Sequence, residues 1–167
     1  PGGNGEYQYD RSQDQYSSTS IKNYNDSFTF ALLAKHTDVD NVDLMADLSG
    51  SITGVQFTYR SDDMEFKVHD SNSNTTKIST NVNTSNTYQW FIMTHDESTG
   101  EIRAYLDKTE YGPSYGTHEP NPDSNIRIAK RGTRSTNYPT MDMADFRYYN
   151  KPISQLEVNN LVDTGSI

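Results

Sequence analysis

The sequence of 167 residues contains no cysteine, which excludes disulfide bonds and thiolate metal sites. This absence leaves the cellular compartment open, because extracellular microbial and viral domains of this size often have no disulfide. The sequence also has no apolar run of 18 residues, so no segment is predicted to cross a membrane as a helix.

Hydrophobic residues are scarce as well, at 32% of the chain. Disordered chains combine low hydrophobicity with few aromatics, but here 12 Tyr, 6 Phe and 1 Trp can supply a packed core. We therefore predict one folded domain over 1–167, with a flexible Gly-rich lead-in at 1–6. The start at Pro1 suggests a piece of a longer protein.

Basic residues are the third scarcity, since 14 Lys and Arg stand against 23 Asp and Glu, a net charge of −9. Phosphate backbones and anionic membranes attract clustered Lys and Arg, so neither is an expected partner. The acidity serves solubility or gathers carboxylates for a cation.

Short segments with alternating apolar residues, separated by turn residues, recur along the chain. Such segments are typical of a β-sandwich or barrel. The segment around Trp90 is apolar on both faces, which predicts a strand buried on both sides. One helix is expected after Ser154, which with Glu157 forms a capping box, and Gly165 would end it. The strands are expected near 27–35, 52–60, 64–68, 78–82, 88–93, 102–106, 126–128 and 141–148.

Three stretches of this pattern resemble a known family. The segment 90–107, with a Trp strand, a turn and a strand ending in Tyr-Leu-Asp, resembles the central hairpin of laminin-G-like jelly rolls. The segment 143–157 resembles the closing strand and short helix of the same family, and 26–30 resembles its early strand. The resemblance implies an all-β, two-sheet antiparallel sandwich of the concanavalin A-like type, with one short C-terminal helix. It also implies a core position for Trp90.

Within that superfamily the fold carries lectins, adhesins, glycanases and spacer modules, so function depends on the site. Retaining glycanases need two facing carboxyl groups. The nearest match, Asp63 and Glu65, would share a strand face but forms an incomplete motif. The four histidines are scattered without ligand-like spacing. We therefore predict a binding domain rather than an enzyme.

The densest set of oxygen ligands is the acidic stretch with Asp38, Asp40 and Asp43. Ca²⁺ takes six to eight oxygen ligands, and a loop with alternating carboxylates supplies several of them. Laminin-G-like domains often hold Ca²⁺ on a loop at the sheet edge, so the resemblance adds weight to a Ca²⁺ site here. The alternative is a solvated acidic loop.

The longest stretch without a strand pattern, roughly 108–123, is predicted to be a long loop, the kind of segment that carries binding sites. Sugars bind aromatic faces together with planar polar groups. Neighbouring loops of sandwich lectins converge at one end, so 109–122 and 131–139 are expected to form one site. The alternative is that the tyrosines only anchor their loops. The predicted ligand-binding residues are Tyr111, Tyr115, His118, Arg134, Asn137 and Tyr138.

The sequence thus predicts a carbohydrate- or receptor-binding module of a larger extracellular, cell-surface or virion-surface protein. Its expected partner is a glycan or a glycosylated receptor, and a homo-oligomeric parent protein is compatible with this role. One alternative is a structural module that spaces or trimerises a fibre. The other alternative, less favoured, is a glycanase or polysaccharide lyase.

Overall fold

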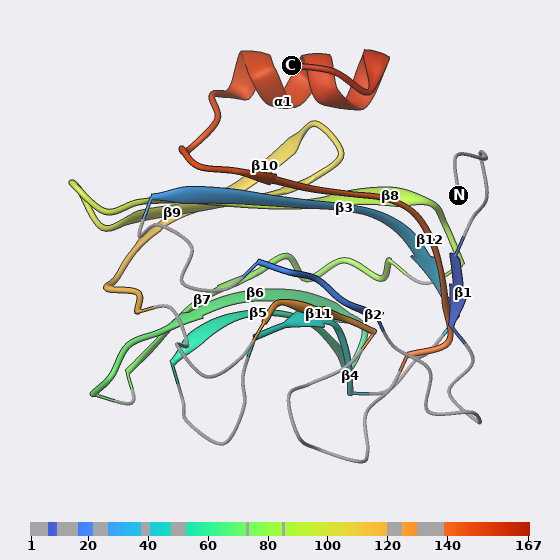
Figure 1. The fold of residues 1–167 in the computed structure, drawn as a ribbon, viewed down its shortest axis with the longest axis horizontal. Helices are drawn as coiled ribbons and strands as arrows, with labels where there is room; N and C mark the ends of the chain where they lie inside the picture. The colour runs from blue at the N-terminus through green and yellow to red at the C-terminus, as the bar shows by residue number, and fades with distance from the viewer. Residues whose placement is uncertain are drawn as a thin grey trace.

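Two six-stranded antiparallel sheets face each other in the computed structural model, and one helix lies on the outer side of the first sheet (Figure 1). The structure describes residues 7–9, 17–21, 27–37, 41–47, 53–72, 74–84, 86–119, 125–129 and 139–167. The first sheet has the order β1 (Tyr7–Tyr9), β12 (Met141–Tyr149), β3 (Phe28–His36), β8 (Gln89–Asp96), β9 (Glu101–Leu106) and β10 (Thr109–Tyr115). The second sheet has the order β2 (Ser17–Ser18), β11 (Arg127–Ile128), β4 (Val42–Ala46), β5 (Gly54–Arg60), β6 (Asp63–His69) and β7 (Thr75–Ser79).

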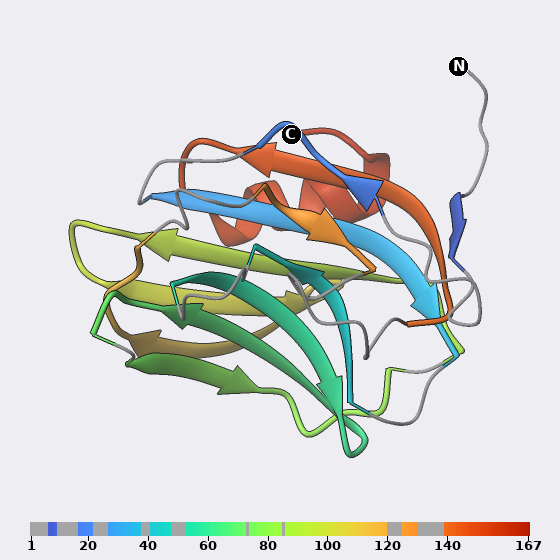
Figure 2. The ribbon, with the colours of Figure 1, turned by 60° about the horizontal axis from the view of Figure 1, so that its bottom comes forward.

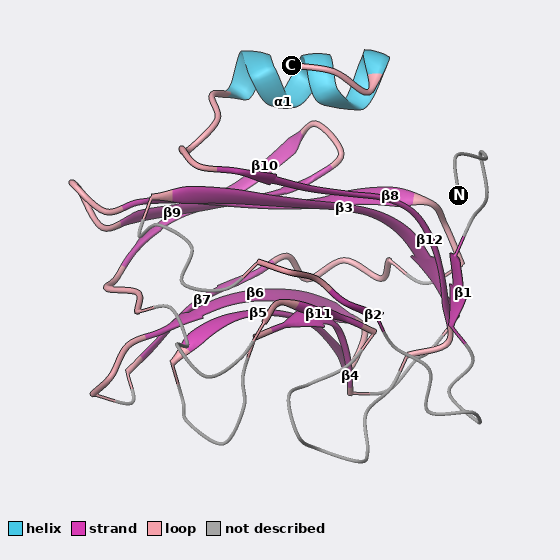
Figure 3. Cartoon of the chain, viewed as in Figure 1, coloured by secondary structure: helices cyan, strands magenta, loops and turns pink. Residues whose placement is uncertain are grey.

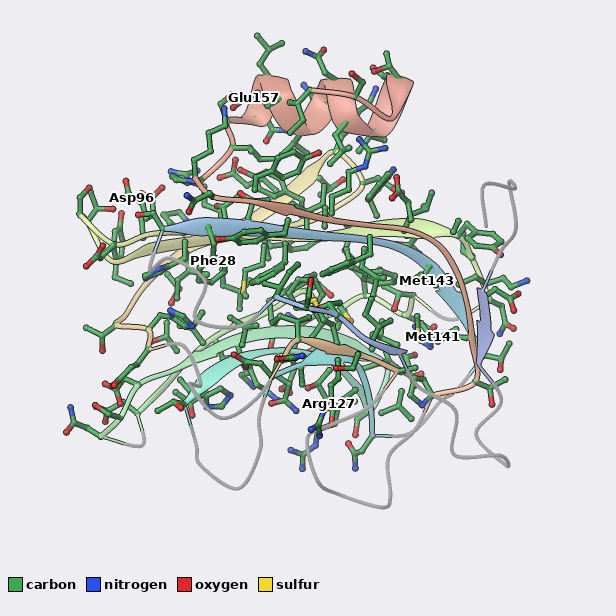
Figure 4. All side chains as sticks on the ribbon, viewed as in Figure 1. Phe28, Asp96, Arg127, Met141, Met143 and Glu157 are labelled. Carbon is green, nitrogen blue, oxygen red and sulfur yellow. The ribbon has the colours of Figure 1, made fainter. Side chains whose placement is uncertain are left out.

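Figure 2 shows the two sheets from a second direction, and the main core fills the space between them, where Figure 4 draws the side chains. Alternate residues of β3, β8, β5 and β6 point into it, because side chains of a strand alternate between its faces. Phe30 pairs with Met93 across β3 and β8. The rings of Phe57 and Phe66 meet edge to face with their centroids 4.9 Å apart. The predicted two-sheet sandwich is confirmed.

A second core lies between the first sheet and the helix α1 (Gln155–Thr164), which Figure 3 shows over the outer face of that sheet. Trp90 and Ile92 point outward from β8 and pack under Val158 and Leu161 of the helix. The strand is therefore buried on both faces, and Trp90 is a core residue, as the sequence predicts.

The helix begins and ends where the sequence places it. The Ser154 side chain accepts a hydrogen bond from the Glu157 backbone, the Glu157 side chain returns to the Ser154 backbone, and Gly165 ends the helix in the left-handed conformation. The buried side of the helix is formed by Val158 and Leu161, whereas Leu156 is 69% exposed. No helix among the described residues is long and apolar enough to span a membrane.

Two predicted loops are strands instead. Residues 109–115 form β10, an edge strand that pairs with β9 and shifts register between Tyr111 and Ser114. Residues 42–46 form β4, which shifts register between Asp43 and Met45. In both strands the register shift interrupts the alternation of inward and outward residues. The sequence therefore does not show the regular two-residue pattern by which a strand is recognised.

Candidate functional site

Three of the predicted ligand-binding residues are described by the structure, and they lie in different environments. Tyr111 packs against the main core from β10, whereas Tyr115, at the end of the same strand, is 63% exposed. His118 follows in the segment after β10 and is buried. The other three predicted residues, Arg134, Asn137 and Tyr138, lie outside the described residues, so the convergence of the two loops stays a prediction.

Tyr115 stands on the outer face of the first sheet, beside a polar row. It is the cross-strand partner of Glu101 on β9, and Glu101 is in turn the partner of Asp96 on β8. The Tyr115 hydroxyl donates a hydrogen bond to Oε2 of Glu101 over 3.3 Å. This contact holds the exposed ring next to charged groups.

A groove of about 410 Å³ opens on this outer face, between the sheet and the start of α1. Outward side chains of β8, β9 and β10 form its floor, and the residues that lead into the helix form its wall. Figure 4 shows Asp96 at the end of the sheet and Glu157 above it at the helix start. The lining residues are Thr94, Asp96, Glu101, Arg103, Tyr105, Glu110, Pro152, Ile153, Ser154, Gln155 and Glu157.

Arg103 organises the floor of the groove. Its Nε donates to Oε1 of Glu101 over 2.5 Å, and its Nη1 donates to Glu110 on the edge strand. The hydrogen bond from Arg103 holds the pKa of Glu101 below its usual range. Burial, with Glu110 nearby, raises the pKa of Tyr105 to about 12. The guanidinium therefore has two carboxylate partners on the protein.

Two more carboxylates border the groove. Hydrogen bonds from Ser98 lower the pKa of Asp96. The hydrogen bond from Lys151, followed by that from the Ser154 backbone, lowers the pKa of Glu157 to about 2. The lining residues thus include four carboxylates and one guanidinium, and the groove is acidic. An exposed aromatic ring beside planar charged groups is suited to a polar ligand with an apolar face, such as a sugar.

A second, smaller hollow of about 170 Å³ lies at the end of the sandwich and is lined by His95, Glu97, Gly100, Gly116, Thr117 and His118. The His118 ring stands edge-on to Phe28, with centroids 4.9 Å apart, and its centroid is 5.6 Å from that of His95. Sequence spacing gave no sign of this contact, because it depends on how the chain returns across the sandwich.

The residues of the predicted Ca²⁺ site are only partly described. Asp43 lies in β4 and is 1% exposed, and its Oδ1 accepts hydrogen bonds from Nε2 of Gln56 and Oγ1 of Thr58. Asp38 and Asp40 lie outside the described residues. Among the described residues no group of three or more potential ligands is arranged to hold a metal ion. The Ca²⁺ site stays a prediction.

Asp63 and Glu65, the nearest match to a glycanase pair, have structural partners. Oδ1 of Asp63 accepts from the backbone nitrogens of Thr80 and Asn81. Burial would raise the pKa of Glu65, but the hydrogen bonds and charges of Lys67 and Lys77 outweigh it and lower this pKa. Glu65 is therefore held as an anion and does not suit the role of a general acid.

The family model of the concanavalin A-like lectin/glucanases superfamily matches residues 10–159, and the chain belongs to this superfamily. No curated protein matches the sequence.

Solved structures share the fold at low sequence identity. The receptor-binding domain of the botulinum neurotoxin C/D mosaic serotype matches with a TM-score of 0.68 at 13% identity, over 83% of this chain and 36% of that one. The binding domain of Paraclostridial Mosquitocidal Protein 1 matches with a TM-score of 0.70 at 15% identity, over 85% of this chain and 38% of that one. A heptameric SAP-like pentraxin from Limulus polyphemus matches with a TM-score of 0.69 at 10% identity, over 91% of this chain and 82% of that one. This chain thus spans less than half the length of the first two of these matched chains, and both are described as binding domains.

The groove itself was missed at the level of sequence. Its floor comes from Glu101, Arg103 and Tyr105, which alternate with the core residues of β9. The charged residues Glu101 and Arg103 at the outward positions of this predicted strand indicate a polar outer face, so the sequence does contain a signal for the floor. The wall, however, depends on where α1 packs, which the local sequence does not determine.

Proposed function

We propose that this domain is a carbohydrate-binding module of a larger extracellular, cell-surface or virion-surface protein, and that the groove beside Tyr115 takes the glycan. The observation that carries the proposal is the exposed Tyr115 ring fixed next to Glu101, at the border of an open polar groove. The description of structural neighbours as receptor-binding domains supports a binding role of this kind.

The groove and the Tyr115 ring beside Glu101 together match the parts of a sugar. The ring of Tyr115 offers an apolar face for the C–H side of a pyranose. Glu101, Glu110 and Asp96 offer carboxylate oxygens, which accept hydrogen bonds from sugar hydroxyls. Arg103 has two carboxylate partners and so offers little to an anion. The acidic lining therefore favours neutral or amino-bearing glycans over sialylated or sulfated ones.

The test is a glycan array that includes neutral, amino-bearing and acidic oligosaccharides, followed by calorimetry with the best binder. Tyr115→Ala should weaken that affinity at least about tenfold, a loss of about 1.4 kcal/mol of binding free energy. The melting temperature should stay unchanged, because the side chain is mostly exposed.

Two further variants separate the causes. Tyr115→Phe keeps the ring and loses the hydroxyl, so it should retain most of the affinity if the ring face makes the contact. Val82→Ala removes another exposed hydrophobic side chain, which follows β7 of the other sheet, and should change nothing. The proposal fails if the folded domain binds no glycan, or if Tyr115→Ala binds as tightly as the parent.

A further inference from the structure

The segment Gly116–Glu119, which directly follows Tyr115, connects the open ends of the two sheets. The Gly116 nitrogen donates to the carbonyl of Gly100 in the hairpin of the first sheet, over 2.9 Å. The Glu119 nitrogen donates to the carbonyl of His69 at the end of β6 in the second sheet, over 3.1 Å. We call these four residues the crossing segment.

His118 anchors the crossing segment between these two bonds. Its side chain is only 9% exposed and packs edge-on against Phe28, the first residue of β3. The hollow beside it is lined by His95 and by Thr117, whose hydroxyl donates to Oδ2 of Asp70 over 2.8 Å. The anchor is thus one imidazole ring inserted into the end of the core.

The surroundings of His118 suit a neutral ring and not a charged one. His95 on β8 and His69 on β6 face it from the two sheets, and burial, followed by these two histidines, lowers the pKa of His118 to about 3. Acidic groups stand at the border: Glu97 lines the same hollow, and Asp70 holds the neighbouring Thr117. Glu119 ends the segment.

We propose that His118 is an acid-sensitive latch, which holds the crossing segment closed while the ring is neutral and releases it when the ring is protonated. Release frees the chain next to Tyr115, so the latch would also weaken ligand binding in acid. This last consequence rests on the proposed function of the groove, whereas the opening itself does not.

The direction follows from proton linkage. An exposed histidine has a pKa of about 6.5, and His118 in the closed segment has a pKa of about 3. Between these values the open state binds a proton and the closed state does not, so closure is stable above about pH 6.5 and weakens as the pH falls. Opening should become about tenfold more favourable for each pH unit in this window, or about a hundredfold at pH 4.5.

The experiment is residue-resolved hydrogen exchange by NMR on the unliganded domain at pH 7.5 and 4.5, with rates corrected for intrinsic exchange. The protection factors of the Gly116 and Glu119 amides should fall about a hundredfold at pH 4.5. The smallest fall that agrees with the latch is about tenfold. Amides in the pairing of β5 and β6, such as Phe57 and Phe66, should change less than threefold.

Variants identify the group that titrates. His118→Phe and His118→Gln should each abolish the pH dependence of protection at Gly116 and Glu119. Two variants are used so that the test remains possible if one of them fails to fold. His36→Gln is the matched control, because His36 is buried at the opposite end of β3, against Thr84, and its loss should leave the effect in place.

Three results would overturn the latch: no fall in protection, an equal fall throughout the chain, or a fall that persists in both His118 variants. None of them depends on a ligand, so failure of the latch is distinguishable from failure of the glycan proposal. Once a ligand is known, its affinity at pH 7.5 and 5 tests the coupling.

Discussion

Replacing Gly116 by alanine should strain the contact between the crossing segment and the edge strand β7. A Cβ atom on Gly116 would lie 1.8 Å from Oγ1 of Thr76 and 2.6 Å from its Cβ. Thr76 is β-branched, so its side chain is stiff and cannot turn away from both contacts. Gly116 is not among the positive-φ glycines, so the cost of alanine comes from the contact rather than from the backbone conformation.

The two edges must separate by more than 1 Å to accept the methyl group, since carbon atoms in contact lie about 3.5 Å apart. Overpacking of this kind costs about 1–3 kcal/mol, and weakening the hydrogen bond between Gly116 and Gly100 adds about 1 kcal/mol. We expect a loss of about 3 kcal/mol, which lowers the melting temperature of a domain of this size by about 6–12 °C.

Guanidinium unfolding followed by Trp90 fluorescence measures the loss, and a double-mutant cycle with Thr76→Gly identifies its cause. Thr76→Gly removes the clashing atoms, so the two substitutions together should cost less than the sum of the single changes, with a coupling of about 2 kcal/mol. A loss below about 0.5 kcal/mol for Gly116→Ala, or strict additivity, would refute the placement of the crossing segment against β7.

Two other predictions address the helix and the metal. Ser154→Ala should lower the free energy of unfolding by about 1 kcal/mol, because it removes the cap of α1, whereas Ser154→Asp should retain most of the stability. Urea unfolding measures both changes. Equal stability of the parent domain and the two variants would contradict the capping role. If Asp38, Asp40 and Asp43 bind Ca²⁺, then Ca²⁺ at a hundred times its dissociation constant should stabilise the domain by about 2.7 kcal/mol relative to a sample with EDTA. Asp40→Asn should remove most of that gain. A melting temperature that does not change with Ca²⁺ would contradict the site.

The elements with local signals were predictable from the sequence. The helix has its cap, its capping box and its terminal glycine within twelve residues, all of them short-range interactions. The double-sided strand around Trp90 was visible from its continuous apolar run. The sequence of β12 also contains a local signal: its apolar residues stand at odd positions 141 and 143 but at even positions 146 and 148, and the structure has a register shift between Met143 and Asp145.

The strands β4 and β10 were not predictable by the same means. In β4, Asp43 occupies a buried position, where Gln56 and Thr58 of β5 donate hydrogen bonds to its Oδ1. In β10, glycine and proline at 112 and 113 are typical of a loop, yet they lie at a register shift on an edge strand, where a missing backbone donor is tolerated. In both cases tertiary partners, which the local sequence does not contain, override the local preference.

The candidate site combines both kinds of information, which explains why the sequence located only part of it. Tyr115 was named because it lies among glycine and proline, but its contact with Glu101 of the adjacent strand was not predicted. His118 was expected to contact the ligand, yet it packs inward against Phe28, 90 residues earlier in the chain. Three positions within the four residues 115–118 thus have different physical roles. An exposed ring at 115 would set affinity, close contact at 116 would set stability, and a buried imidazole at 118 would set the response to acid.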